Sequence, residues 1–363
     1  MELICTLKGL CDKLPAFGFS EELEAALREY LQFLRKRDDL LQLAETYHND
    51  IYENGRYTPA EVARLPECDG REEGMLFAAI FLARYARMDE ILARRGIDPK
   101  QKQTALDIFC TQINKNKAIT GKYGFNGYYR MATVNMLKPN RYTLGRLVFE
   151  TATFDYPFEI YRRKSDGADL PMALPGFRYM PDGRQAARDY EGECFEPTLE
   201  ATQNQVTGYT FDGDGRLIFE PVTLSLAEHE KAVAKGDDAI SIHIPGGGRM
   251  TPEAVADAIA QAKEFFAKHF ADMDFKVYMC SSWLMDTAMK EFLSPETNIL
   301  KFQNIFRVVL TGVNTFSLHW HIFGIEQFVP LTELKPANDF QRTFLDRAKA
   351  GKTMYSGLGY FFL

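Results

Sequence analysis

The chain has 363 residues, enough for two or three domains, and its 46% hydrophobic and 26% charged content is ordinary for a globular protein. A formal net charge of −7 argues against nucleic acid as a main partner, because phosphate backbones are bound by basic surfaces. The longest apolar run, residues 75–83, stops at Arg84 and is too short to cross a bilayer, so we expect no membrane partner.

The six cysteines form no CxxC pair and lie mostly in apolar surroundings. This pattern indicates reduced thiols rather than a disulfide framework or a zinc site. The N-terminal residues also lack the charged-then-apolar pattern of a signal peptide. Together these features predict a soluble, cytoplasmic protein.

The first 140 residues predict a helical domain, because their apolar side chains recur at helical spacing. Ser20 is a suitable N-cap for a helix over 21–36. Thr58 is a suitable cap for a second helix, which has Pro59 in its first turn. Three further helices are expected at residues 72–94, 98–113 and 127–138.

Beyond the helical domain the sequence takes on the pattern of a sheet. Strands are expected at 145–154 and 157–164, joined by the Asp155–Tyr156–Pro157 turn. Residues 165–200 are rich in Gly, Pro and Asp and predict a long loop. Residues 207–224 predict a hairpin that turns at an Asp-Gly pair. The pattern then runs strand, helix, strand, short helix, strand and strand, at 238–245, 252–270, 274–282, 286–293, 305–312 and 316–323.

A strand–helix–strand order puts one parallel connection into an otherwise antiparallel sheet. We therefore predict an α+β chain in two domains. A helical domain is expected at 1–140, and a mixed α/β sheet domain at 141–363.

The junction after the strand at 238–245 has the features of an anion site. Its glycines permit close approach to the backbone, its arginine adds a positive charge, and its threonine is a good helix N-cap. Free N–H groups at a glycine loop and a helix N-terminus bind phosphate, although a flexible turn with an exposed arginine has the same sequence. The GxxxxGK[ST] and GxGxxG patterns are absent. The candidate binding residues are Ile244, Gly246, Gly247, Gly248, Arg249, Met250 and Thr251.

Three stretches resemble a bacterial family of two-domain acyltransferases, which have a helical N-terminal domain and a GNAT-like C-terminal domain. The stretches are GDDAISIHIPGGGRMTPEAV at 236–255, CSSWLMD at 280–286 and SPETNILKFQNIF at 294–306. The resemblance is strongest over 225–310. The loop departs from the usual superfamily pattern, because its arginine follows the glycines instead of preceding them.

The resemblance implies transfer of an acyl group from acetyl-CoA or another acyl-CoA to an amine of a small molecule or peptide. The junction residues and Ser281 would bind coenzyme A, with the pyrophosphate on the glycine loop. In a GNAT fold the thioester lies between two strands that splay apart, here 238–244 and 275–281. The sequence identifies neither the acceptor nor the acyl length, and it allows an oligomer.

Such a reaction requires a base for the amine proton, a donor for the developing oxyanion and an acid for the leaving thiolate. His243 ends the first splayed strand, where it would act as the base or hold the loop by hydrogen bonds. Ser282 ends the other strand, where it would donate to the thioester carbonyl or cap the next helix. Glu220, like Glu150, is expected on a strand of the central sheet, as a base through water or as a solvated side chain.

Other side chains are weaker candidates. His319 and His321 form an H-x-H on the last expected strand, but no third ligand is evident, so we expect no metal. Cys280 would need a lowered pKa to act as a nucleophile, and an inert buried thiol is expected instead. Tyr355 and Tyr360 are candidate acids for the thiolate or parts of a further strand.

The same sequence features also fit two other classes of function. A non-catalytic ligand-binding or interaction protein on the same scaffold would use the helical domain as a docking surface. A phosphate-ester or nucleotide enzyme would need magnesium-binding carboxylates near the loop. The nearest carboxylates, Asp237 and Asp238, precede the strand and lie at its wrong end.

Overall fold

The computed structural model describes residues 2–66, 68–70, 74–138, 140–187, 190–245, 248–313, 317–325 and 328–363. The chain divides into two compact units, Met1–Thr143 and Leu144–Leu363. This division concerns compactness alone, so the domain limits 1–140 and 141–363 stay a prediction. No helix among the described residues is long and apolar enough to cross a bilayer.

The first unit is helical, as expected. The Ser20 hydroxyl accepts the N–H of Leu23, and Thr58 and Glu61 cap each other at the start of the next predicted helix. Both predicted caps are therefore confirmed. The helices are α1 (Glu2–Lys13), α2 (Glu21–Leu34), α3 (Asp38–His48), α4 (Pro59–Val62), α5 (Met75–Ala93), α6 (Gln103–Thr120) and α7 (Gly127–Met136), with short turns η1 (Leu14–Phe17), η2 (Asn49–Glu53) and η3 (Pro99–Lys102).

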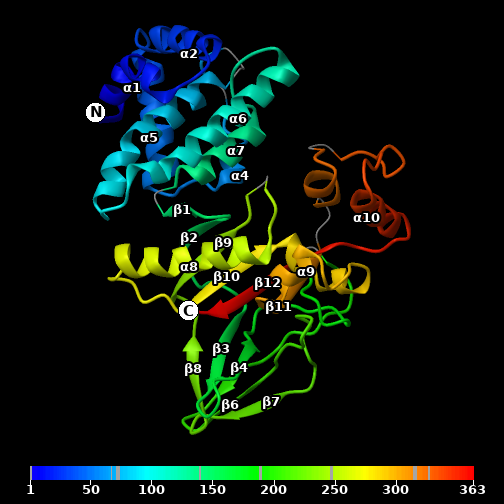
Figure 1. Cartoon of the computed structure of the whole chain (residues 1–363). Coiled ribbons are helices and arrows are strands. Elements are labelled where there is room, and N and C mark those ends of the chain that lie inside the picture. The colour runs from blue at the N-terminus through cyan, green and yellow to red at the C-terminus, as the bar shows by residue number, and fades with distance from the viewer. Residues whose placement is uncertain are drawn as a thin grey trace. The chain divides into compact units, whose positions relative to one another are not determined.

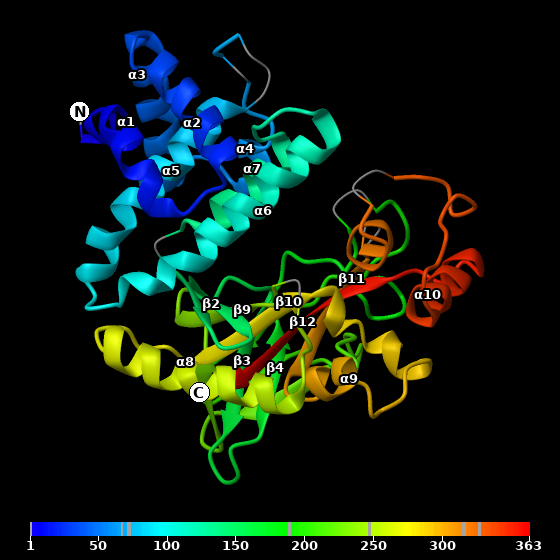
Figure 2. The ribbon, with the colours of Figure 1, turned by 45° about the horizontal axis from the view of Figure 1, so that its top comes forward.

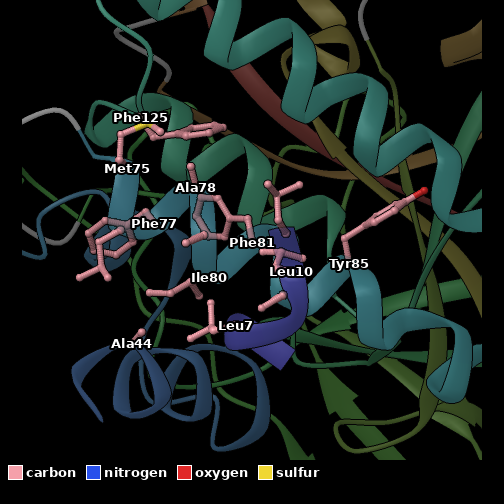
Figure 3. Packing of buried hydrophobic residues seen from close by; sticks show 14 of the residues in the cluster. Leu7, Leu10, Ala44, Met75, Phe77, Ala78, Ile80, Phe81, Tyr85 and Phe125 are labelled. Atoms are coloured by element: carbon pink, nitrogen blue, oxygen red, sulfur yellow. The ribbon is translucent and has the colours of Figure 1, made fainter. Parts of the chain in front are cut away.

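Helix α5 forms the core of this unit (Figure 3). Every residue from Met75 to Tyr85 is buried, and a helix that is apolar on all sides must be covered by neighbours. Helices α1, α2, α3 and α7 pack around it. Arg84, the charged residue that follows the apolar run 75–83, is buried too. The Arg84 guanidinium pairs with Glu53 at 2.7 Å and lies over the ring of Tyr52 at 4.9 Å.

The second unit is built on a six-stranded sheet in the order β1-β2-β9-β10-β12-β11 (Figure 1). Strands β9 and β10 run parallel and are joined by helix α8 (Pro252–His269), as the strand–helix–strand pattern predicts. The strands are β1 (Arg141–Leu144), β2 (Leu147–Thr153), β9 (Asp238–His243), β10 (Val277–Ser282), β11 (Arg307–Val313) and β12 (Tyr355–Phe362).

Helix α8 covers one face of this sheet (Figure 1 and Figure 2), where Phe266 packs edge-on against Phe149 of β2. A second sheet, β4-β3-β8, covers the other face, and its Phe158 and Ile160 share a core with Met279 of β10. A third small sheet, β5-β6-β7, lies beyond it. Their strands are β3 (Phe158–Arg163), β4 (Asp169–Ala173), β5 (Glu200–Ala201), β6 (Gln205–Gly208), β7 (Val222–Ser225) and β8 (His229–Val233).

The hairpin predicted over 207–224 is present, because β6 pairs with β7 and the chain turns beyond the Phe211–Leu217 bridge. The loop predicted over 165–200 is partly wrong, since it contains β4. That strand lies at a sheet edge, where Pro171 is tolerated. Because proline is more typical of loops, the sequence pattern did not reveal the strand. The turn at 155–157 joins strands of two different sheets.

The last predicted strand, 316–323, is also wrong where the structure describes it. Its residues form a π-helix, η6 (Leu318–Ile322), which buries Leu318 and Ile322 in a small core with Phe344. The place beside β11 is taken by β12 instead. The remaining elements are η4 (Trp283–Met285), η5 (Thr287–Glu291), α9 (Asn298–Gln303) and α10 (Asp339–Lys349).

Two glycines allow β12 to lie in the middle of the sheet. A Cβ at Gly357 would stand 2.3 Å from the carbonyl oxygen of Met285, and one at Gly359 would stand 2.6 Å from Cβ of Phe306. Any side chain there would force the packed neighbours apart.

We predict that Gly359→Ala lowers the free energy of unfolding by about 1–3 kcal/mol, because it overpacks the interior. Gly312→Ala on the adjacent β11 is the matched control, since a Cβ there meets no described heavy atom within 4 Å. Urea unfolding of the two variants measures the difference. Equal stability of the two variants would contradict the role of the bare Gly359 backbone.

Candidate active site

The parallel strands β9 and β10 are paired over only part of their length. Their last pair joins Ser241 to Met279. Beyond it, His243 of β9 stays paired with β2, whereas Ser282 of β10 pairs with Gly357 of β12. Each strand thus follows its outer neighbour, and the two C-terminal ends part as the resemblance implies.

A cleft of about 440 Å³ lies at these parted ends, a size typical of small-molecule sites. It brings together four of the predicted site residues: His243, Ile244, Ser281 and Ser282. The complete lining is Ile242, His243, Ile244, Pro245, Cys280, Ser281, Ser282, Trp283, Leu284 and His321.

His243 is paired with a carboxylate in this cleft. Glu150 and Ser241 are register partners on β2 and β9, so Glu150 and His243 lie on the same face of the sheet. The Nε2 atom of His243 is 2.8 Å from Oε2 of Glu150, whose side chain is 12% exposed. An ionised carboxylate can only accept, so Nε2 donates, and the pair fixes the orientation of the imidazole.

Glu150 is therefore the carboxylate on the central sheet that lies beside His243, a place for which Glu220 was the other candidate. Glu220 was expected on a strand of the central sheet, and this expectation is wrong. It lies exposed in a bend before β7 and does not line the cleft. The reason is that regular pairing of the hairpin stops at the Phe211–Leu217 bridge and resumes only at Val222.

The two serines at the end of β10 face opposite ways. Ser281 is exposed and lies on the same side of the sheet as Met279 and therefore as His243. The hydroxyl of Ser282 accepts the N–H of Leu284 at 3.1 Å and so caps η4. Its own proton can still be donated, and its role as an oxyanion donor stays a prediction.

The loop that precedes α8 is described in part. Gly246 and Gly247 lie outside the described residues. Gly248 has the left-handed φ of 65°, which favours glycine, and Arg249 is exposed. The Thr251 hydroxyl accepts the N–H of Ala254 at 3.3 Å, so the predicted N-cap is confirmed, whereas anion binding at this helix end stays a prediction.

The two histidines of the H-x-H do not share one strand face, because they lie on the π-helix η6. Nε2 of His319 is 2.8 Å from the Val329 carbonyl oxygen. The ring of His321 stacks on Trp283 and lines the cleft, where burial lowers its pKa. In the part of the chain that the structure describes, no three His, Cys, Asp or Glu side chains gather to hold a metal.

The tyrosines considered as acids lie away from the cleft. Tyr360 is 1% exposed in the core between the sheets, its hydroxyl donates to Asp169, and burial raises its pKa. Tyr355 lies under the guanidinium of Arg184, whose central carbon is 4.0 Å from the ring centroid. Neither tyrosine lines the cleft, so the source of the thiolate proton has to be sought elsewhere.

A second groove, of about 540 Å³, runs along α8 and α9. It begins beside Met250 and Pro252 at the N-terminus of α8, and most of its walls are apolar. Lys263 and Lys301 are its two charged lining residues. No local sequence pattern indicates this groove, because it depends on where α9 packs against α8.

Residues 142–361 match the family described as the GNAT-like C-terminal domain. An acyltransferase in complex with decanoyl-CoA and teicoplanin is 19% identical, with a TM-score of 0.59 over 91% of this chain and 80% of that chain. A mutant acyltransferase in complex with octanoyl-CoA is 18% identical, with a TM-score of 0.63 over 97% of this chain and 87% of that one. At these identities the likeness shows the fold alone. No curated protein matches the chain.

Cys280 is buried in the cleft wall, and burial raises the pKa of its thiol to about 12. We predict that iodoacetamide at neutral pH modifies the exposed Cys5 and Cys68 well before Cys280 in the folded protein. Mass spectrometry of the digested protein measures the order of labelling. Rapid labelling of Cys280 would instead revive its role as an acyl-carrying nucleophile.

Proposed function

The chain belongs to the family of GNAT-like C-terminal domains, and on this premise we propose that it transfers an acyl group from a coenzyme A thioester to an amine. The observation that carries the proposal is the pairing of His243 with Glu150 at 2.8 Å beside the parted strands. A histidine held by a carboxylate in a cleft is a suitable base for an amine.

In the proposed reaction the amine nitrogen attacks the thioester carbonyl carbon while His243 takes a proton from the amine. Glu150 holds the imidazole and stabilises the charge that it acquires. The carbonyl oxygen becomes negative and is stabilised by the hydroxyl of Ser281 or Ser282. A carbon–nitrogen bond forms as the carbon–sulfur bond breaks, and the proton that His243 took from the amine passes on to the leaving thiolate, directly or through water.

The parted strands also suit the donor. Beyond Ser241 and Met279 the facing backbone edges of β9 and β10 no longer pair with each other. The amide-containing arm of coenzyme A can pair with such edges much as an added strand would. We place the pyrophosphate at the N-terminus of α8, with Gly248 and Arg249 beside it.

The groove between α8 and α9 is proposed to take the adenosine end of the donor. It adjoins the same helix end as the loop, its apolar walls suit a purine base, and Lys263 and Lys301 suit a ribose phosphate. Coenzyme A bound in this way would span from the groove to the cleft.

The acceptor is proposed to be an amine of a small molecule or peptide. One similar protein was solved with teicoplanin, a glycopeptide, and similar proteins were solved with octanoyl-CoA and decanoyl-CoA. Donors of that length therefore belong beside acetyl-CoA in any test of activity. A cytoplasmic setting, which the reduced cysteines favour, is part of this proposal.

We predict that His243→Gln lowers kcat by about 10²–10⁴-fold without weakening coenzyme A binding, because only the base is lost. Glu150→Gln should lower kcat less, since the imidazole remains. Release of free thiol measures turnover, and calorimetry measures coenzyme A affinity. His229→Gln on β8 is the matched control, because His229 does not line the cleft.

Unchanged turnover in His243→Gln would contradict the role of His243 as the base and leave it the structural role of holding the loop. Wild-type protein that binds coenzyme A but transfers no acyl group to a panel of amines would favour the non-catalytic alternative. Wild-type protein that binds neither coenzyme A nor its thioesters would refute the proposed function.

A further inference from the structure

We propose that Arg146 binds the diphosphate of the coenzyme A donor, together with the N-terminus of α8. This inference rests on the proposed function for the identity of the ligand. It concerns a residue outside the glycine loop, on the turn that joins β1 to β2.

The turn that carries Arg146 lies tightly against α8. Gly145 has a left-handed φ of 56°, and a Cβ on it would stand 3.2 Å from Cα of Ala258. The bare glycine therefore lets the turn approach the helix that begins at the loop. The turn thus lies against α8 at Ala258, inside the helix, and the Arg146 side chain extends from there.

The side chain of Arg146 reaches Gly248 at the end of the loop. Its Nη2 atom is 3.4 Å from the Gly248 carbonyl oxygen, a weak hydrogen bond at most. A Cβ at Gly248 would stand 3.5 Å from Nε of Arg146, so the guanidinium stem lies along the glycine. Arg146 thus lies against the described end of the loop at Gly248.

The charge of Arg146 lacks a counterion among the described residues. Its Nε atom is buried and has no hydrogen-bond partner there. Burial alone lowers the pKa of Arg146, with no contribution from a carboxylate. Arg84 and Arg307 differ, because Arg84 pairs with Glu53 and Arg307 with Asp169. A partly buried cation without a counterion leaves room for a bound anion to pair with it.

The site suits a diphosphate better than a single carboxylate. The guanidinium of Arg146 offers a fork of donors, the capped end of α8 offers backbone N–H groups, and Arg249 follows the same glycines. Several donors around one ligand fit a group with two phosphates. Arg146 also supplies from another turn the arginine that the usual loop pattern carries before its glycines.

The test compares Arg146→Met with wild type and with Arg163→Met, a control on β3 whose arginine pairs with exposed Asp166. We expect Arg146→Met to weaken coenzyme A and inorganic pyrophosphate binding at least tenfold by calorimetry. The ligand-free variant should unfold at the same temperature as wild type or higher, because a partly buried charge without a counterion is removed. The control should change neither affinity.

Each outcome separates the alternatives. A lower unfolding temperature with unchanged affinities would overturn the proposal and make Arg146 structural. Should Arg146→Met fail to fold, Arg146→Lys keeps the charge but loses the fork, and affinities equal to wild type would again overturn it. Pyrophosphate binding that depends on Arg146, without any acyl transfer, would sustain this inference while the proposed function failed.

Discussion

The insertion of β12 between β10 and β11 is the constraint on which the site depends. A strand has two edges, and β10 offers one to β9 and the other to β12. Beyond Met279 it keeps only β12, while β9 keeps only β2. The strands part because each follows its outer neighbour. The bare glycines of β12 let it pass close to Met285 and Phe306, so β10 stays on its course.

The two ends of this opening differ in charge. At the cleft, His243 pairs with the carboxylate of Glu150, which lies beside the cleft and does not line it. At the start of α8 the described residues contribute arginines and a helix N-terminus, which suit a ligand with negative charge. The groups proposed for proton transfer and those proposed for anion binding thus lie on the two sides of one short strand end.

The sequence predicted what local signals encode. Helix α8 was found because Thr251 and Pro252 are local start signals, and its neighbours β9 and β10 because they are apolar runs of strand length. The place of β12 depends on pairing between distant segments, so no local pattern reveals it. Glu150 could not be preferred to Glu220 before the register of β2 against β9 was known. The π-helix η6 escaped because short apolar runs fit both a strand and a helix.

The central position of β12 also governs how this unit is made. Its partner β10 ends at Ser282, yet the pairing strand closes only with Phe362. Until that residue has left the ribosome, the edges of β10 and β11 stay open while the helical unit can already fold. Open strand edges invite pairing with other chains. The nascent protein is therefore an expected client for chaperones, because β12 is made after both of its partner strands and completes the sheet around the candidate site.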